Sequence, residues 1–303
     1  MNEFIKRTLS ATVYAAVVVS SILVNRYYFG AVFLIVTLLA VREYMHLMSA
    51  QRRQTVGAMV AAALLFATGF FLSLASAEVN AHPGSDEGLA GVYGVIGGVL
   101  FLVWLVLMIV LLVSEVFRHT DKPIHDWGTL LQSQWMIAFP FMLTNFLLLF
   151  SPYCLLMVFI AIWVNDTGAY IVGCTTAKLM PNGNHKMAPH ISPAKSWEGL
   201  AGGYVFTLLC AAVFVWVGWM GRAYADYVEP VMWWHAVLFA VVVSTTATLG
   251  DLMESLMKRS LGVKDSGCFM PGHGGVLDRF DSLLLTVPVW FIVSLIVSLL
   301  SEL

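Results

Sequence analysis

Long apolar runs alternate with short polar connections along almost the whole chain. Most runs reach the roughly 20 residues that a helix needs to cross about 30 Å of hydrocarbon. The nine runs cover residues 9–24, 27–41, 56–77, 91–113, 128–149, 152–173, 197–221, 231–250 and 280–300. The pattern predicts an all-α fold, a polytopic integral membrane bundle of about nine transmembrane helices, of which the first two are short.

The composition agrees with membrane residence. The chain has 303 residues, of which 59% are hydrophobic and only 11% are charged, whereas a soluble domain carries about 25% charged residues. Lys6 and Arg7 precede the first run, as they would in a signal peptide. Because no polar mature domain follows, a retained first helix is expected.

The basic residues predict the orientation in the membrane. With a cytoplasmic N-terminus and nine alternating helices, the outer side of the membrane holds only Arg26 and Arg222. The other 14 of the 16 Lys and Arg residues fall on the cytoplasmic side, which is a strong positive-inside signal. The expected C-terminus is therefore outside, and the polar stretch "KDSGCFMPGHGGVLDRFDS" (264–282) faces the cytoplasm.

Three polar pieces on this inner side combine acids with glycine. The first is "WVNDTGAYIVG", at the expected inner end of the sixth helix, where Asp166 has no basic residue within four positions. A carboxylate near membrane depth is costly and is a functional candidate. The alternative is a helix-end cap at the interface.

The second piece, "HISPAKSWEGLAGG", predicts a helix start with Ser192 as the cap and Pro193 at the first helical position. Lys195 and Glu198 then lie three residues apart on one helix face. The alternative is a surface ion pair between them, which would stabilise the fold by well under ~1 kcal/mol.

The third piece contains two acidic helix ends. If the eighth helix continues past Gly250, one face carries Asp251, Glu254, Ser255 and Lys258. Asp278 and Asp281 are three apart at the start of the last helix, and such like charges repel unless a cation lies between them. Ligand sets made only of carboxylates suit Mg²⁺ rather than zinc.

The glycines of "PGHGG" lie directly before the last helix. Gly272, Gly274 and Gly275 flank His273 in this stretch. Their permissive backbone can direct N–H groups at an anion beside a helix N-terminus. Alone, His273 would be an ordinary loop histidine. Together, the acids, bases and glycines indicate a phosphate-bearing, metal-bound substrate that meets a lipid at this surface.

The stretch "SLMKRSLGVKDSGCFMPGHGGVLDRFD" (255–281) closely resembles the signature of the phosphatidate cytidylyltransferases. The matching positions are Ser255, Lys258, Arg259, Lys264, Asp265, Gly267, the "PGHGG" run, Asp278, Arg279 and Asp281. The "GD" at 250–251, "SPAKSWEG" and the Asp of "NDTGAY" also resemble family motifs, in family order. Met270 departs from the usual Leu or Ile, an exchange of similar volume.

The resemblance implies transfer of CMP from CTP to phosphatidate, giving CDP-diacylglycerol and pyrophosphate. It divides the chain into four N-terminal transmembrane helices (1–127) and a catalytic region (128–303). The catalytic residues it implies are Asp251, Lys258, Lys264, Asp265, His273, Asp278, Arg279 and Asp281. The substrate-binding residues are Asp166, Ser192, Lys195, Glu198, Ser255, Arg259, Gly272, Gly274 and Gly275.

The resemblance also predicts the partners of the protein. Mg²⁺ is expected on Asp251, Asp278 and Asp281, with room for a second cation. CTP, phosphatidate and membrane lipid are the expected partners, a homodimer is compatible with the chain, and nucleic acid is not expected. The expected location is a bacterial inner membrane, with the active site facing the cytoplasm.

Other functions are open at this point. A CTP-dependent polyprenol kinase shares the nucleotide, and an isoprenoid-lipid cytidylyltransferase shares the chemistry. A cation-coupled transporter would use the acids as an ion pathway. A transporter favours acids in mid-helix, whereas these acids are expected at inner helix ends among lysines and glycines.

Overall fold

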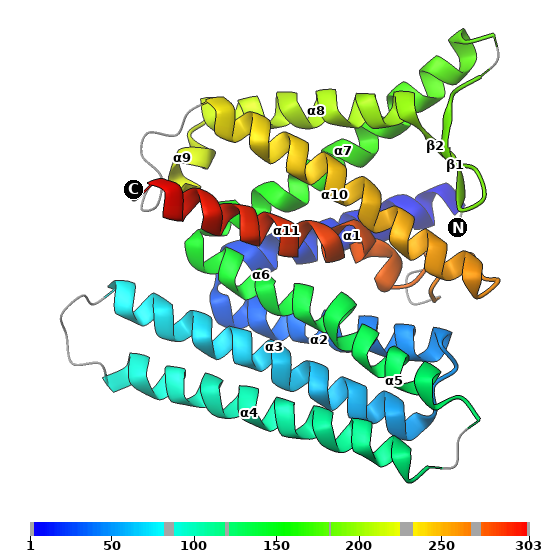
Figure 1. Cartoon of the computed structure of the whole chain (residues 1–303). Coiled ribbons are helices and arrows are strands. Elements are labelled where there is room, and N and C mark those ends of the chain that lie inside the picture. Colours follow the sequence, from blue (N-terminus) through cyan, green and yellow to red (C-terminus); the bar gives the residue numbers. More distant parts are fainter. Residues whose placement is uncertain are drawn as a thin grey trace. The chain divides into compact units, whose positions relative to one another are not determined.

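The computed structural model describes residues 3–81, 88–118, 121–181, 183–224, 233–267 and 274–301, and within these residues each of the nine predicted runs is mainly helical (Figure 1). One short β-hairpin is the only strand structure among the described residues. Within the described part of the chain, eight helices are long and apolar enough to cross a membrane, and the apolar part of the first helix, Thr8–Val24, is shorter. The protein is therefore a polytopic helical membrane protein, as predicted.

The chain folds as two compact units, each built from two stretches of sequence. The first unit comprises residues 1–149 and 265–278, and the second comprises residues 150–264 and 279–303. The signature loop, here residues 265–278, therefore belongs to the first unit. The division at residue 127, which follows the extent of the family motifs, stays a prediction.

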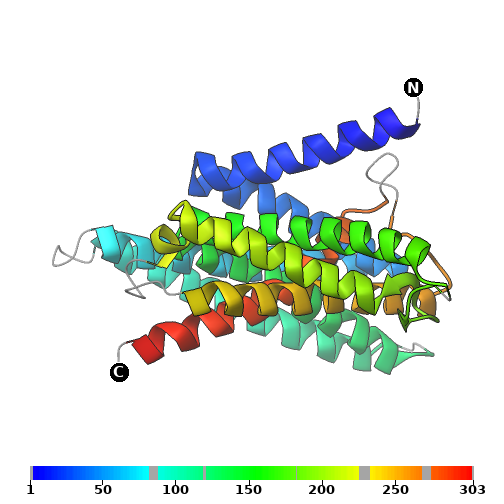
Figure 2. The same ribbon diagram turned by 90° about the horizontal axis from the view of Figure 1, so that it is seen from above.

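The first unit contains the N-terminal helices. Helix α1 (Glu3–Val24) packs against α2 (Arg26–Leu47), as Figure 2 shows from above, and α2 packs against α3 (Arg52–Ala81), which packs against α4 (Gly88–Val116). Asn25 separates α1 from α2 and caps α2, because its side chain accepts a hydrogen bond from the Tyr28 N–H.

The fifth predicted run contains a π-helical segment. It comprises α5 (Pro123–Gln132), the π-helix η1 (Ser133–Ala138) and α6 (Phe139–Phe150). Pro140 has no N–H to donate to the carbonyl four residues earlier, and the Phe139 N–H reaches back five residues to the Gln134 carbonyl. The segment turns Gln134 inward, where its Nε2 donates to the Ala58 carbonyl at 3.0 Å.

The second unit has a core of three mutually packed helices, α7 (Pro152–Leu179), α8 (Trp197–Trp216) and α10 (Trp233–Ser260). The short helix α9 (Trp219–Tyr224) follows α8, because the chain turns at Gly218, whose φ is +73°. The run predicted as one helix over 197–221 is thus two helices. The last helix, α11 (Leu277–Ser301), packs on α10 in this unit through a Thr246–Thr286 hydrogen bond and the Phe239–Trp290 ring contact.

The predicted helix start at Ser192 is wrong. Residues 192–196 form strand β2 (Ser192–Ser196), antiparallel to β1 (Lys186–Ala188), so that Pro193 lies in a strand. Helix α8 begins four residues later, where the Ser196 side chain accepts a hydrogen bond from the Gly199 N–H at 3.1 Å. Ser196 suits the cap because its backbone is extended and its hydroxyl also accepts from Asn184.

Candidate functional site

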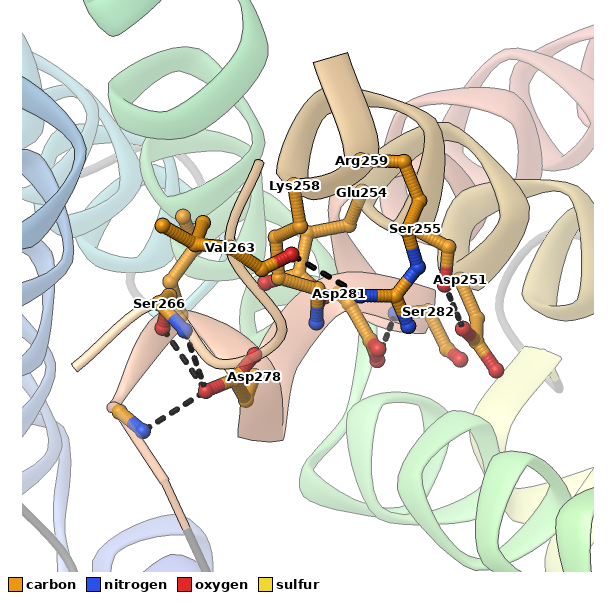
Figure 3. Close-up of polar contacts among 12 residues, drawn as sticks. Asp251, Glu254, Ser255, Lys258, Arg259, Val263, Ser266, Asp278, Asp281 and Ser282 are labelled. Carbon is orange, nitrogen blue, oxygen red and sulfur yellow. Dashed lines mark hydrogen bonds and ion pairs between the residues drawn. The ribbon is translucent and has the colours of Figure 1, made fainter. Parts of the chain in front are cut away.

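The second unit joins the predicted residues Lys195 and Asp251 directly. The Lys195 Nζ lies 2.7 Å from Asp251 Oδ2 and donates to the Thr248 carbonyl at 3.1 Å. The other Asp251 oxygen accepts from the Ser255 hydroxyl at 3.2 Å, one helical turn along α10 (Figure 3). The side chains are 20% and 34% exposed, respectively. The strand β2 thus brings a cation to a carboxylate that solvent can still reach.

Two further predicted carboxylates belong to the same cluster. Asp251 interacts electrostatically with both Asp166 and Asp281, which also interact with each other. Asp281 Oδ1 accepts from the Ser282 N–H at 2.6 Å. Asp166 is exposed but lies near the middle of α7, because that helix continues well beyond the apolar run. Its predicted place at an inner helix end is therefore wrong.

Basic side chains surround these three acids. Lys195 and Arg279 interact electrostatically with Asp166, and Lys258 interacts with Asp281. The arrangement combines carboxylates that repel one another with cations that offset part of the repulsion. Within the second unit, it joins six of the predicted site residues into one charged cluster, and an anionic ligand carrying a divalent cation would match both kinds of charge.

Gly250 explains how α10 and α11 approach each other at this cluster. A Cβ atom on Gly250 would lie 2.8 Å from the Asp281 carbonyl oxygen and 3.1 Å from the Ser282 Cα. Both neighbours are backbone, so neither can rotate away. The glycine of the "GD" pair thus allows Asp251 to lie beside the α11 backbone that carries Asp281.

The predicted face of α10 is confirmed as a geometric feature. Asp251 bonds to Ser255, and the Glu254 Oε2 accepts from the Lys258 Nζ at 2.6 Å (Figure 3). Lys258 is 8% exposed and Glu254 is 6% exposed, so this ion pair is buried. Lys258 is therefore engaged inside the protein rather than presented on the surface as a phosphate ligand would be.

Arg259 is exposed and holds backbone carbonyls. Its Nη1 donates to the Val263 carbonyl at 2.9 Å, and its Nε donates to the Ile191 carbonyl at 3.3 Å. Arg259 thereby ties the end of α10 to the turn of the β-hairpin. Lys264 and Asp265, which follow, are both exposed.

The alternative pairing of Lys195 with Glu198 is wrong. Glu198 accepts from the His185 backbone N–H at 3.1 Å, and its Oε1 lies 2.6 Å from His185 Nδ1. Lys195 points elsewhere because it precedes α8 and stands in a strand. Ser192, a predicted substrate ligand, pairs with Ala188 across the hairpin. Glu198 and His185 thus fix the chain that leads into α8.

In the first unit, Asp278 closes the signature loop. Its Oδ2 accepts from the Ser266 N–H at 2.9 Å, from the Ser266 hydroxyl at 2.9 Å and from the Gly275 N–H at 2.7 Å (Figure 3). Gly274 has a φ of +83°, which favours glycine. A carboxylate in the first turn of α11 also suits the helix dipole. The predicted residues Gly272 and His273 lie outside the described residues.

One residue of this loop network was not predicted. Glu43, from α2, accepts from the Leu277 N–H at 2.9 Å and from the Ser266 hydroxyl at 3.4 Å. The sequence contained one signal, an acid at the end of the second apolar run. That signal does not indicate a contact with the loop, because Glu43 lies more than 200 residues from the signature in sequence.

The carboxylates of both units are the candidate metal ligands. Within the residues that the structure describes, no group of three or more His, Cys, Asp or Glu side chains is arranged as a metal-binding set. The carboxylates Asp166, Asp251 and Asp281 nevertheless supply the oxygen donors that Mg²⁺ prefers. By themselves, however, they do not form a set that could hold a metal ion.

The fold and the charged cluster define a polytopic helical membrane protein that gathers acidic and basic side chains in its second unit. A family model described as "Cytidylyltransferase family" matches residues 5–297. The chain belongs to the cytidylyltransferase family.

Several curated relatives, named phosphatidate cytidylyltransferase, are similar to part of the chain. The Staphylococcus saprophyticus protein is 41% identical over 135 residues, which cover 45% of this chain and 46% of that protein. The Bacillus subtilis protein is 41% identical over 137 residues, covering 45% of each chain. The Haemophilus influenzae protein is 41% identical over 142 residues, which cover 45% of this chain and 43% of that protein. The chain spans about half the length of the curated relatives it matches.

Proposed function

We propose that the protein transfers CMP from CTP to phosphatidate and releases pyrophosphate, leaving CDP-diacylglycerol in the membrane. The observation that carries this proposal is the complete signature from Ser255 to Asp281 in a chain of the cytidylyltransferase family. The named activity of the relatives supports the same reaction. The apolar helices suit a substrate that stays in the lipid phase.

The reaction requires charge neutralisation more than proton transfer. An oxygen of the phosphatidate phosphate attacks the α-phosphorus of CTP, a new P–O bond forms, and the bond to the β-phosphate oxygen breaks. The nucleophile is already anionic near pH 7. The barrier lies in bringing two anions together and in stabilising the pyrophosphate that leaves. A protein needs cations and a metal for this step, and no activated serine or cysteine.

Lys195 is well placed for such a role. It bonds to Asp251 at 2.7 Å and is 20% exposed, so a phosphate that approaches from solvent can compete for its ammonium group. We propose that Lys195 binds CTP phosphates and that Arg279 and Lys264 add positive charge around them. Arg259, which ties the hairpin to α10, orders the backbone beside Lys195.

We further propose Mg²⁺ as the cofactor, held by Asp251 and Asp281. Mg²⁺ is usually bound by one or two carboxylates together with substrate phosphates, which suits these two half-buried acids. When bound, it would neutralise charge on the phosphates and the leaving group. Asp278 as a further ligand, a second cation and a homodimer stay predictions.

We also propose that this chemistry occurs at the cytoplasmic face of a bacterial inner membrane. The basic residues of both units support this orientation through the positive-inside rule. The relatives come from bacteria, which supports a bacterial inner membrane as the location.

The test is a pyrophosphate assay on purified protein in detergent with CTP, Mg²⁺ and phosphatidate. We expect release of pyrophosphate that requires both substrates and matches the CDP-diacylglycerol formed. Excess chelator should stop it, and Mg²⁺ should restore it. Release of CDP with a polyprenol, or ion flux in vesicles without CTP consumption, would contradict the proposal. Turnover in excess chelator would contradict the proposed Mg²⁺ cofactor but not the proposed reaction.

A further inference from the structure

Glu43 binds both described ends of the signature loop. Its Oε2 accepts from the Leu277 N–H at 2.9 Å, at the start of α11, and from the Ser266 hydroxyl at 3.4 Å. These partners lie on either side of the "PGHGG" run in the sequence. One side chain from α2 therefore holds the loop on both sides of its glycine-rich run.

Two signature glycines are needed because Glu43 lies against them. A Cβ atom on Gly267 would lie 2.7 Å from Glu43 Oε1, and one on Gly275 would overlap Glu43 Oε2 and the Ser266 hydroxyl. Real Cβ atoms do not approach oxygens so closely, so the absence of a side chain at both positions makes room for the carboxylate. The loop sequence and Glu43 thus fit each other.

Ser266 connects Glu43 to Asp278. The Ser266 hydroxyl lies 2.9 Å from Asp278 Oδ2 and 3.4 Å from Glu43 Oε2, and its single proton can serve only one of them at a time. The Ser266 and Gly275 N–H groups hold Asp278, while the Leu277 N–H holds Glu43. Loss of Glu43 would therefore leave the Leu277 N–H without its acceptor and loosen the segment whose Ser266 and Gly275 donors hold Asp278.

The end of α2 that carries Glu43 is itself anchored in the first unit. The adjacent residue, Tyr44, is 2% exposed and donates its phenol to the Gln132 Oε1 at 2.5 Å. Gln132 directly precedes the π-helical segment. Because Tyr44 is fixed by this bond, the Glu43 backbone has little freedom, and its carboxylate meets the loop at a defined position.

We propose that Glu43 is a positioning residue that sets the signature loop and, through Ser266 and Leu277, the Asp278 carboxylate. The inference rests on the cytidylyltransferase activity proposed above. It gives the N-terminal helices a part in that activity, since they supply the side chain that orders a motif encoded near the other end of the chain.

Hydrogen–deuterium exchange tests the contact without any substrate. Removing a charged acceptor in Glu43→Ala should speed exchange of the Leu277 amide by about tenfold or more. Glu43→Gln keeps one acceptor oxygen and should stay within a few-fold of the wild type. The matched control is Glu115→Ala, a buried glutamate of α4 that pairs with Arg118 and should leave the Leu277 amide unchanged. Unchanged exchange in Glu43→Ala would overturn the proposal.

Turnover of the same samples tests the positioning role. We expect kcat to fall at least about tenfold in Glu43→Ala and less in Glu43→Gln, whereas Glu115→Ala keeps the wild-type kcat per folded protein. The double variant Glu43→Ala/Ser266→Ala should lower kcat by less than the product of the two single fold-changes, because both residues belong to one hydrogen-bond network. Wild-type kcat in Glu43→Ala would overturn the role. A wild type without pyrophosphate release would contradict the proposed function instead, and the exchange result would stand by itself.

Discussion

At the scale of single residues, the ion pairs decide which cations a ligand can reach. Lys195 and Glu198 are close in sequence but bind Asp251 and His185 instead. Lys258 is closed into a pair with Glu254 that is almost fully buried. Lys264, only six residues later, is exposed. These two signature lysines therefore lie in different environments, although the resemblance implies a catalytic role for both.

Replacing Lys258 by Met should destabilise the protein. The substitution deprives the buried Glu254 carboxylate of the cation 2.6 Å away, and breaking a buried pair costs about 3–5 kcal/mol. The midpoint of thermal unfolding in detergent should fall, and Glu254→Gln in the same variant should recover much of the loss. An unchanged midpoint in Lys258→Met would show that the pair does not stabilise the fold.

Lys264→Met is the matched comparison and should behave differently. Because Lys264 is exposed, its loss should leave the unfolding midpoint unchanged. If its ammonium group serves CTP phosphates, turnover should drop by at least about tenfold. The pyrophosphate assay measures this directly, and normal turnover would limit Lys264 to a topology signal.

The sequence predicted which polar residues share a helix face better than it predicted the residues they contact. The face Asp251, Glu254, Ser255 and Lys258 followed from helical spacing alone. The contacts of Lys195 and Glu43 depend on how distant segments pack, and no local pattern encodes that. Spacing reports which residues share a helix face, whereas a salt bridge across elements needs the fold.

At the scale of elements, the approach of α10 to α11 depends on one glycine. Gly250→Ala should force the helices apart, because the added methyl group would meet the α11 backbone at 2.8 Å. We expect lower thermal stability and loss of turnover, since Asp251 and Asp281 would separate. Gly221→Ala, where nothing lies within 4 Å of the new Cβ, is the control and should be tolerated.

The β-hairpin before α8 gives a second test at this scale. Ser196→Ala removes the cap of α8 and the acceptor for Asn184, and should cost about 1 kcal/mol of unfolding free energy. Ser192→Ala, at the position first predicted as the cap, should cost almost nothing. Equal effects of the two variants on unfolding would contradict the observed cap.

The hairpin also shows why element boundaries were the weaker part of the sequence prediction. "SPAKSWEG" contains two serines that can each cap a helix, and Pro193 favours the first helical turn as well as an extended strand end. Pairing with β1 decides between them, and that pairing is a tertiary contact. The apolar runs, by contrast, follow from solvation in lipid and were all helical.

At the scale of the whole molecule, the basic residues predict which face each connection meets. The connections within residues 78–90 and 222–230 are expected outside, so single cysteines placed there should react with an impermeant reagent from outside the cell. A cysteine at Lys186, on the exposed edge of β1, should react only after the membrane is opened. Labelling of position 186 in intact cells would contradict the predicted orientation and, with it, the proposed cytoplasmic location of the site.

The assignment of residues 265–278 to the first unit has a consequence for biosynthesis. Glu43 and Ser266 are 223 residues apart, so at 5–20 residues per second a ribosome needs roughly 10 to 45 s between them. During that interval α2 already exists, but the segment that its glutamate fastens has not been made. The N-terminal unit is therefore the first to start folding and cannot be completed until most of the second unit has been synthesised.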